Sequence, residues 1–245
     1  MSIAVAVIGA SGRLGRVVCD VVEATPEFDL VARLGSADSG DLADDAAIVV
    51  DVTTPQSSEA IVDRALQRGQ KVLVGTSGWS AEKLAALEKK MQSLPGSAVM
   101  VVPNFSVGSV VGTRLAMVAA QFFDSVEIIE AHHRDKIDSP SGTARRTAEQ
   151  IAEVRRDRGG VVAPHTNQTA RGEQVDGIPV HSLRLSGVVA HQDVVFGGVS
   201  ETLRITHETH SADAYRHGIR LALLALPHQA GLVVGLDAAL GFSAE

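Results

Sequence analysis

A glycine-rich turn joins an apolar strand to a helix near the N-terminus. The run Ile3–Ile8 is wholly apolar, as is typical of a strand buried on both faces of a parallel sheet. Gly9, Gly12 and Gly15 follow it, and a helical pattern rich in valine comes directly afterwards. Glycines here permit a tight turn and let the backbone approach a pyrophosphate, whose charge the helix N-terminus favours. The spacing is G-x-x-G-x-x-G, a variant of G-x-G-x-x-G, so dinucleotide binding is favoured over a plain tight turn.

Strands and helices alternate through the first hundred residues. This rhythm is typical of an α/β fold with a Rossmann-type, doubly wound parallel sheet that helices cover on both faces. We predict strands at residues 3–8, 30–34, 48–52, 72–75 and 98–102, with helical patterns near residues 17–22, 61–66 and 81–91.

The rhythm changes after Asn104. A helix is predicted at 107–122, a strand at 126–131 and a helix at 143–156, and strands at 179–184, 188–196 and 202–207 then follow one another without helices. Consecutive strands of this kind indicate a mixed sheet with antiparallel members, so we expect an α+β domain here. Residues 159–175 are expected to form a loop, and 214–226 to return to helix. The predicted domains are residues 1–105 with 212–245, and residues 106–211.

Charge and composition argue against several kinds of partner. The formal net charge is −7 at pH 7, whereas a surface that binds nucleic acid needs positive potential. No apolar run approaches the length that spans a bilayer, and the N-terminus has neither a basic region nor a cleavage site. Cys19 is the only cysteine, which agrees with a reducing compartment. We expect a cytoplasmic protein that binds neither nucleic acid nor membrane.

Three turns at the carboxyl ends of predicted strands are the candidates for holding a dinucleotide. In an open α/β sheet the ligand lies outside these strand ends. We expect the first turn to hold the pyrophosphate and the other two to hold the nicotinamide half. The candidate residues are Gly9, Ala10, Ser11, Gly12, Arg13 and Leu14 in the first turn, Gly75, Thr76 and Ser77 in the second, and Val102, Pro103, Asn104 and Phe105 in the third.

The end of the second predicted strand bears on the choice of coenzyme. An acidic residue at this place usually binds the ribose hydroxyls. No carboxylate occurs between residues 32 and 36, and the nearest one is Asp38. Arg33 is a candidate contact for a 2′-phosphate, with a solvated surface arginine as the alternative. NADPH and NADH both remain expected cofactors.

A predicted helix start lies in the densest group of reactive side chains, residues 130–144. Pro140 disfavours helix at Ser139, and Ser141 is then the expected N-cap. The amides near Gly142 and Thr143 would point out of the helix start toward a carboxylate.

Two imidazoles and an ammonium precede that helix start. His132, His133 and Lys136 lie within a few residues of it, so they form a predicted cationic pocket for a small acid. The same groups are able to deliver a proton. The alternative is that the two histidines merely end a strand and that the basic side chains are solvated, and for Arg134 we favour solvation.

Adjacent histidines are also typical of metal sites. His181, His191 or His207 would complete such a site. Arg134 and Lys136 would place positive charge beside the metal ion, and neither a cysteine nor a close pair of acidic ligands supports it. We therefore predict no metal.

These motifs resemble the 4-hydroxy-tetrahydrodipicolinate reductase family, long called dihydrodipicolinate reductases. The resemblance runs nearly end to end, and the segment with the two histidines is highly specific. It rests on the sequences of residues 9–15, 102–106, 130–136, 139–144 and 175–181. The resemblance implies an NAD(P)-binding Rossmann domain and a substrate-binding and oligomerisation domain that assembles a homotetramer. It further implies NADH- or NADPH-dependent reduction of a cyclic dicarboxylate of lysine and diaminopimelate biosynthesis.

The resemblance also implies roles for single residues. His132 is similar to the family's catalytic acid/base and Lys136 to its proton donor. His133, Gly142 and Thr143 match the contacts to the substrate carboxylate.

The chain departs from the family pattern at two places. Many members have an acidic residue where Gly35 stands, so the coenzyme preference does not transfer. Several members have an arginine three residues before an aromatic residue near the last helix. This chain has Ala212 three residues before Tyr215, so a cofactor contact near Ala212 does not transfer either.

Two other functions remain as alternatives. One is a different two-domain NAD(P)-linked dehydrogenase of an amino-acid pathway, which His132 and His133 disfavour. The other is a non-catalytic NADPH-binding sensor. A sensor needs no proton donor beside an anion site, so Lys136 argues against it.

Overall fold

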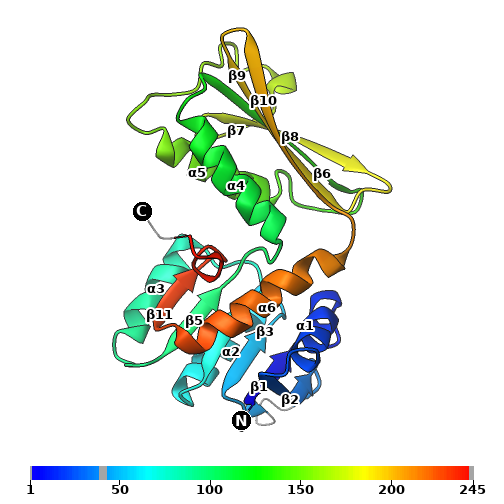
Figure 1. Ribbon diagram of the computed structural model, residues 1–245, viewed down its shortest axis with the longest axis vertical. Helices are drawn as coiled ribbons and strands as arrows, with labels where there is room; N and C mark the ends of the chain where they lie inside the picture. The colour runs from blue at the N-terminus through cyan, green and yellow to red at the C-terminus, as the bar shows by residue number, and fades with distance from the viewer. Residues whose placement is uncertain (1, 39–42, 243–245) are drawn as a thin grey trace. The chain divides into compact units, whose positions relative to one another are not determined.

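The computed structural model describes residues 2–38 and 43–242. The chain forms two compact units (Figure 1). The first unit comprises Met1–Val107 with Ala212–Glu245, and the second comprises Gly108–Ser211. The predicted domain boundaries lie within a few residues of these limits.

The first unit is built on a six-stranded parallel sheet of order β11-β5-β4-β3-β1-β2. The strand order reverses at β1, which lies between β2 and β3, and ligands bind at such switch points in open α/β sheets. This confirms the predicted Rossmann-type sheet. The strands are β1 (Ile3–Ile8), β2 (Phe28–Leu34), β3 (Ile48–Asp51), β4 (Lys71–Val74), β5 (Ala98–Val101) and β11 (Gly231–Val234), and the α-helices are α1 (Arg13–Glu23), α2 (Pro55–Gln67), α3 (Ala81–Met91) and α6 (Arg216–Ala225).

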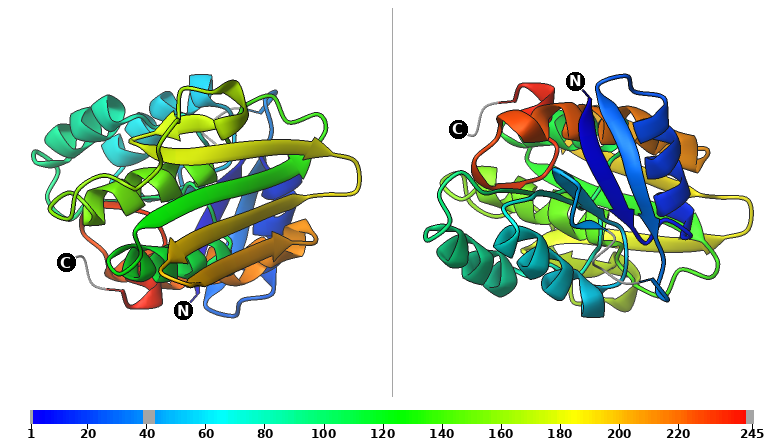
Figure 2. Two further views of the ribbon diagram at one scale, coloured as in Figure 1. Left: turned by 90° about the horizontal axis from the view of Figure 1, so that it is seen from above. Right: turned by 90° about the horizontal axis from the view of Figure 1, so that it is seen from below.

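Helices cover both faces of this sheet (Figure 2, right). Val62 of α2 and Leu87 of α3 pack with Val49, Val72 and Val99 in one core cluster. The helices α1 and α6 contact each other beside the opposite face. Because both faces are covered, every residue of β3 and of β5 is buried, which accounts for the apolar runs at residues 48–50 and 98–101.

The second unit is built on a five-stranded mixed sheet of order β10-β9-β6-β8-β7. The central strand β6 runs parallel to β8 and antiparallel to β9, which confirms the predicted mixed sheet. The strands are β6 (Ser125–His133), β7 (Glu173–Val175), β8 (Ile178–Leu185), β9 (Ala190–Gly198) and β10 (Glu201–Thr209), and the α-helices are α4 (Val107–Ala120) and α5 (Gly142–Val154).

One face of the second sheet packs against α4 and α5 (Figure 2, left). Alternate residues of β6 point to this side, and Val126 and Ile128 are buried there with Ile151 of α5. Leu183 and Leu185 of β8 alternate onto the other face and are 43% and 47% exposed.

Two parts of the chain contain secondary structure that was not predicted from the sequence. The predicted loop at 159–175 contains the 3₁₀ turn Thr169–Arg171 and the strand β7. That strand is only three residues long, and it forms through pairing with β8 across Asp176 and Gly177, both at positive φ. The strand β11 was not predicted, because its four residues are fixed by pairing with the distant β5.

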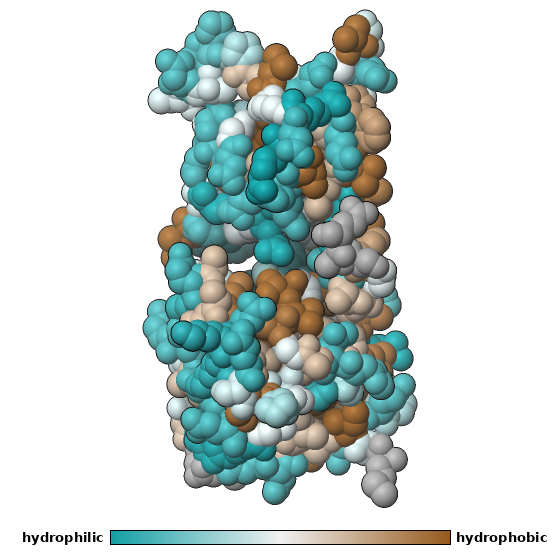
Figure 3. All heavy atoms as spheres, turned by 90° about the vertical axis from the view of Figure 1, so that its left-hand side faces the viewer, coloured by the Kyte–Doolittle hydropathy of each residue, from teal (hydrophilic) through white to brown (hydrophobic). Residues whose placement is uncertain are grey.

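The surface is mixed in character. Hydrophobic side chains lie among hydrophilic ones on the face drawn in Figure 3. Within residues 2–38 and 43–242, the helices lack the length and apolar character needed to span a bilayer.

Candidate active site

The first glycine turn is packed as tightly as only glycine allows. Gly9 has φ of 92°, and a Cβ placed on it would lie 2.4 Å from the carbonyl oxygen of Val52. A Cβ on Gly15 would lie 2.1 Å from the carbonyl oxygen of Gly9. The start of α1 is therefore pressed against the end of β1, at the reversal of the strand order.

The N-terminus of α1 has the features of an anion site. Its N-cap is Gly12, which has no side chain with which to cap the helix. The first turn carries Arg13 and Leu14 and has no acidic residue. Backbone N–H groups and the positive end of the helix dipole therefore suit a bound pyrophosphate.

The three predicted dinucleotide turns lie together at one sheet edge. A Cβ on Gly75 would lie 2.8 Å from Cε2 of Phe105 and 3.4 Å from Cδ2 of Leu14, so residues of all three turns meet around Gly75. Thr76 is buried, and its hydroxyl accepts a 2.8 Å hydrogen bond from the backbone N–H of Thr53. The dinucleotide contacts of every candidate residue in these turns, Ala10, Ser77, Val102, Pro103 and Asn104 included, remain predictions.

Asp51 supports this edge and was missed by sequence reasoning. It is fully buried at the end of β3. Its carboxylate accepts hydrogen bonds from the Thr53 hydroxyl, at 2.6 Å, and from the Ser58 hydroxyl. The only sequence signal was a single carboxylate inside the otherwise apolar strand predicted at 48–52.

Two charged groups lie near the end of β2. Arg33 forms an ion pair with Glu23, and both side chains are about half exposed. The backbone N–H of Gly35 donates a 2.6 Å hydrogen bond to Oδ2 of Asp38. A Cβ on Gly35 would lie 3.5 Å from that oxygen and 3.7 Å from the Ser11 hydroxyl. A carboxylate is thus present at this strand end, although it comes from three residues further along the chain.

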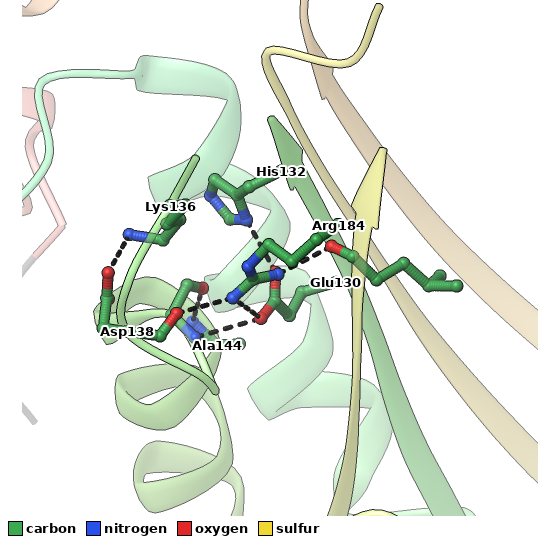
Figure 4. Close-up of polar contacts among 8 residues, drawn as sticks. Glu130, His132, Lys136, Asp138, Ala144 and Arg184 are labelled. Atoms are coloured by element: carbon green, nitrogen blue, oxygen red, sulfur yellow. Dashed lines mark hydrogen bonds and ion pairs between the residues drawn. The ribbon is translucent and has the colours of Figure 1, made fainter. Parts of the chain in front are cut away.

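In the second unit, His132 is held by a buried carboxylate (Figure 4). Nδ1 of His132 lies 2.6 Å from Oε2 of Glu130, and Glu130 is fully buried. Arg184 of β8 donates to both oxygens of this carboxylate at 3.0 Å. The backbone N–H of Ser141 donates to Oε1 at 3.1 Å. Neither Glu130 nor Arg184 was assigned a role from the sequence.

These donors determine the charge of Glu130. Burial by itself raises the pKa of a carboxyl group. Hydrogen bonds from His132, Arg184, the Ser182 hydroxyl and the Ser141 amide outweigh burial and lower the pKa of Glu130 to about 2. Glu130 is therefore a carboxylate at neutral pH.

The helix α5 starts where the sequence predicted a helix start. Ser141 is the N-cap, and its hydroxyl accepts a 3.2 Å hydrogen bond from the backbone N–H of Ala144. Gly142 and Thr143 are the first two residues of the helix, where the positive end of the helix dipole favours a carboxylate.

Lys136 lies in a turn that follows β6 directly. Its backbone N–H donates to the carbonyl oxygen of His133 at 3.1 Å. Its ammonium lies 2.6 Å from Oδ1 of Asp138. Burial opposes ionisation of Asp138, but the Lys136 ammonium and the backbone N–H of Gly142 contribute to a net lowering of its pKa.

The structure gathers His132, Lys136, Gly142 and Thr143 around the end of β6 and the start of α5. His133 is the last residue of β6, directly before the turn that leads to Lys136. Arg134 is 73% exposed, as expected for a solvated side chain. The catalytic and substrate-binding roles remain predictions.

The histidines considered as metal ligands have other surroundings. His181 contacts Glu127 at 2.7 Å, and His191 lies 3.4 Å from Asp193. His207 packs against Gly108. In the described ranges, no group of three or more His, Cys, Asp or Glu side chains is arranged to hold a metal ion.

Family models match both units. Residues 3–105 match the N-terminal model of dihydrodipicolinate reductase, and residues 108–240 match the C-terminal model.

Similar proteins and structures carry the same name. A 4-hydroxy-tetrahydrodipicolinate reductase of Clavibacter sepedonicus is 54% identical over 97% of this chain and 86% of its own length. One from Streptomyces coelicolor is 42% identical over 95% of this chain and 96% of its own. A dipicolinate-bound dihydrodipicolinate reductase from Paenisporosarcina sp. TG-14 is 31% identical, with a TM-score of 0.81 over 97% of this chain and 99% of that chain. The chain therefore belongs to the dihydrodipicolinate reductase family.

Proposed function

We propose that this chain reduces 4-hydroxy-tetrahydrodipicolinate to tetrahydrodipicolinate with NADPH or NADH, in lysine and diaminopimelate biosynthesis. The observation that carries this proposal is the joint placement of His132, Lys136 and the start of α5. It supplies proton-exchanging groups beside a site for a carboxylate. The named relatives have this activity in their names, and the Paenisporosarcina structure holds dipicolinate, an aromatic dicarboxylate.

The domain of residues 1–105 and 212–245 would hold the dinucleotide. The uncapped start of α1 at Gly12 suits the pyrophosphate. The turns around Gly75 and Phe105 would hold the nicotinamide half. When bound, the nicotinamide supplies a hydride.

The domain of residues 106–211 would hold the substrate. Backbone N–H groups of Gly142 and Thr143 bind one carboxylate, and His133 adds a contact from the end of β6. The reduction replaces the 4-hydroxyl group by hydrogen, so one hydride and one proton are taken up and water leaves. Lys136 donates the proton with which the 4-hydroxyl group leaves as water. His132, as the acid/base, takes up a proton from the reacting ring and returns it, so that no further net proton is gained.

We further infer that the enzyme is a cytoplasmic homotetramer. The support is the family resemblance, together with the exposed Leu183 and Leu185 on the sheet face opposite α4 and α5. Exposed apolar side chains on a sheet face are typical of a surface that another subunit covers. We expect light scattering to give the mass of a tetramer for the wild type and a lower mass for Leu185→Glu, because a charged side chain on this face would weaken the contact between subunits.

A coupled assay tests the proposed reaction. Condensation of pyruvate with aspartate semialdehyde supplies the substrate, and the absorbance of NADPH and NADH is followed. We expect the wild type to oxidise at least one coenzyme and Lys136→Ala to lose about 10²-fold or more of kcat. Arg134→Ala is the matched control, since its side chain is 73% exposed, and it should keep wild-type activity.

The same assay separates the alternatives. If the wild type oxidises neither coenzyme, the reductase proposal is wrong. Coenzyme binding without turnover would favour the sensor, and turnover only with another amino-acid substrate would favour a different dehydrogenase.

A further inference from the structure

Glu130 is a buried charge that the proposed chemistry has not used. A carboxylate is tolerated away from water only where donors surround it. Here the donors come from three places: the His132 ring on the same strand, the Arg184 guanidinium on β8, and the backbone N–H at the N-cap of α5. Glu130 therefore joins the three segments that frame the candidate active site.

We propose that Glu130 is a positioning residue, which holds His132 with a proton on Nδ1 and leaves Nε2 as the ring atom that exchanges a proton with the substrate. This inference rests on the proposed function, in which His132 is the acid/base. Nδ1 lies 2.6 Å from Oε2 of Glu130. An ionised carboxylate only accepts hydrogen bonds, so Nδ1 must be the donor. In the neutral ring Nε2 then has a free lone pair.

Arg184 prevents the carboxylate from turning away. It forms a bidentate pair, with one guanidinium nitrogen on each oxygen of Glu130 at 3.0 Å. It also donates to the carbonyl oxygens of Leu183 and Asp138, each at 2.6 Å. Because Arg184 is aligned with His132 in the β6–β8 ladder, the register of the two strands sets this geometry. A bidentate arginine fixes orientation as well as charge.

The same strand contains a matched set of side chains on its other face. Glu127 contacts the His181 ring through Nε2 at 2.7 Å and Arg171 at 2.5 Å. This second set thus contains the same three residue types. Strand alternation places Glu127 on the opposite face of the sheet from Glu130. The side chains of Glu127, His181 and Arg171 are about one-third exposed. Glu127→Gln is therefore a control for general effects of removing a Glu–His contact.

The substitution Glu130→Gln should reverse the tautomer. A glutamine amide has one acceptor and one donor. If its NH₂ replaced Oε1, it would face both the Ser141 N–H and Arg184, and neither of these donors is able to become an acceptor. If it replaces Oε2, it faces one guanidinium nitrogen of Arg184 and Nδ1 of His132, and Nδ1 is able to accept when the ring proton moves to Nε2. The second arrangement leaves one donor facing a donor where the first leaves two, so it is favoured and Nε2 loses its lone pair.

Solid-state ¹⁵N NMR of histidine-labelled protein reads the tautomer directly, with His132→Gln used for assignment. We expect neutral His132 to be protonated on Nδ1 in the wild type and in Glu127→Gln, and on Nε2 in Glu130→Gln. An Nε2–H wild type, or an unchanged tautomer in Glu130→Gln, would overturn the proposal. The wild-type spectrum also decides the question if Glu130→Gln does not fold.

Kinetics give the second readout. Glu130→Gln should lose roughly tenfold to hundredfold in kcat with KM changed less than about twofold, and Glu127→Gln should keep both values. Equal losses in the two variants would show a merely structural role and would overturn the inference. If the wild type has no reductase activity but shows Nδ1–H, the proposed reaction fails while the positioning of His132 stands.

Discussion

The ammonium of Lys136 lies 2.6 Å from a carboxylate oxygen of Asp138. That carboxylate also takes the backbone N–H of Gly142 at the start of α5. The proposed proton donor and one of the proposed substrate amides are therefore both engaged by a carboxylate of the chain itself. A substrate carboxylate would have to compete with Asp138 for them.

We predict that Asp138→Asn binds dipicolinate more tightly than the wild type. Loss of the charge weakens the competing contact, and one such hydrogen bond corresponds to about threefold to tenfold in affinity. Isothermal titration calorimetry with dipicolinate measures the change. Asp135→Asn is the control, because Asp135 is 79% exposed beside Arg134 and should not affect binding. Weaker binding to Asp138→Asn would mean that Asp138 orients Lys136 and does not compete with the ligand.

Acid should remove the stability that Glu130 contributes. Its pKa falls from an ordinary 4.5 to about 2 in the folded protein, so its contribution is complete above pH 4.5 and is lost as the pH falls toward 2. The shift corresponds to roughly 3 kcal/mol at neutral pH. Urea unfolding at several pH values should show the wild type more stable than Glu130→Gln at pH 7, with the difference shrinking below about pH 4.5. A difference that does not depend on pH would refute this origin.

Arg33 should distinguish the two coenzymes. Its ion pair with Glu23 is half exposed, so it contributes only about 0–1 kcal/mol and is readily exchanged for a 2′-phosphate. We expect Arg33→Ala to raise KM for NADPH more than for NADH. Equal effects on the two coenzymes would exclude a role at the 2′-phosphate.

Asp38 should act in the opposite sense. Its carboxylate accepts the N–H of Gly35 at the end of β2, where an acidic group usually binds ribose hydroxyls. A carboxylate there repels a 2′-phosphate. Asp38→Ala is therefore expected to raise KM for NADH and to lower KM for NADPH in steady-state assays. A fall in KM for both coenzymes would argue against ribose binding by Asp38.

Gly218 should be indispensable for the packing of α6. A Cβ on it would lie 1.9 Å from the carbonyl oxygen of Phe105, which is backbone and unable to give way. We expect Gly218→Ala to destabilise the protein by about 1–3 kcal/mol, measured by thermal unfolding. Gly112→Ala is the control in the interior of α4, where the nearest atom would be 3.9 Å away. It should be neutral or stabilising by up to about 1 kcal/mol. Similar losses in both variants would contradict the steric argument.

Local patterns determined much of the fold. The apolar run of β1 and the glycines after it predict the β1–turn–α1 unit, because both constraints act within fifteen residues. Ser141 was predicted as an N-cap, and its hydroxyl caps Ala144. The mixed sheet followed from strands without intervening helices. Each of these predictions depends on contacts or periodicities between neighbours in the sequence.

Tertiary structure alone decided how the reactive groups are arranged. The sequence placed His132 and Lys136 near a helix start, but gave no sign that Glu130 would face Arg184, which is 54 positions away. That contact depends on the parallel register of β6 and β8. The meeting of Gly75 with Phe105 likewise depends on the pairing of β4 with β5. Residue types and local periods are properties of short segments, whereas burial, ionisation and the tautomer of a ring depend on which distant segments the sheets bring together.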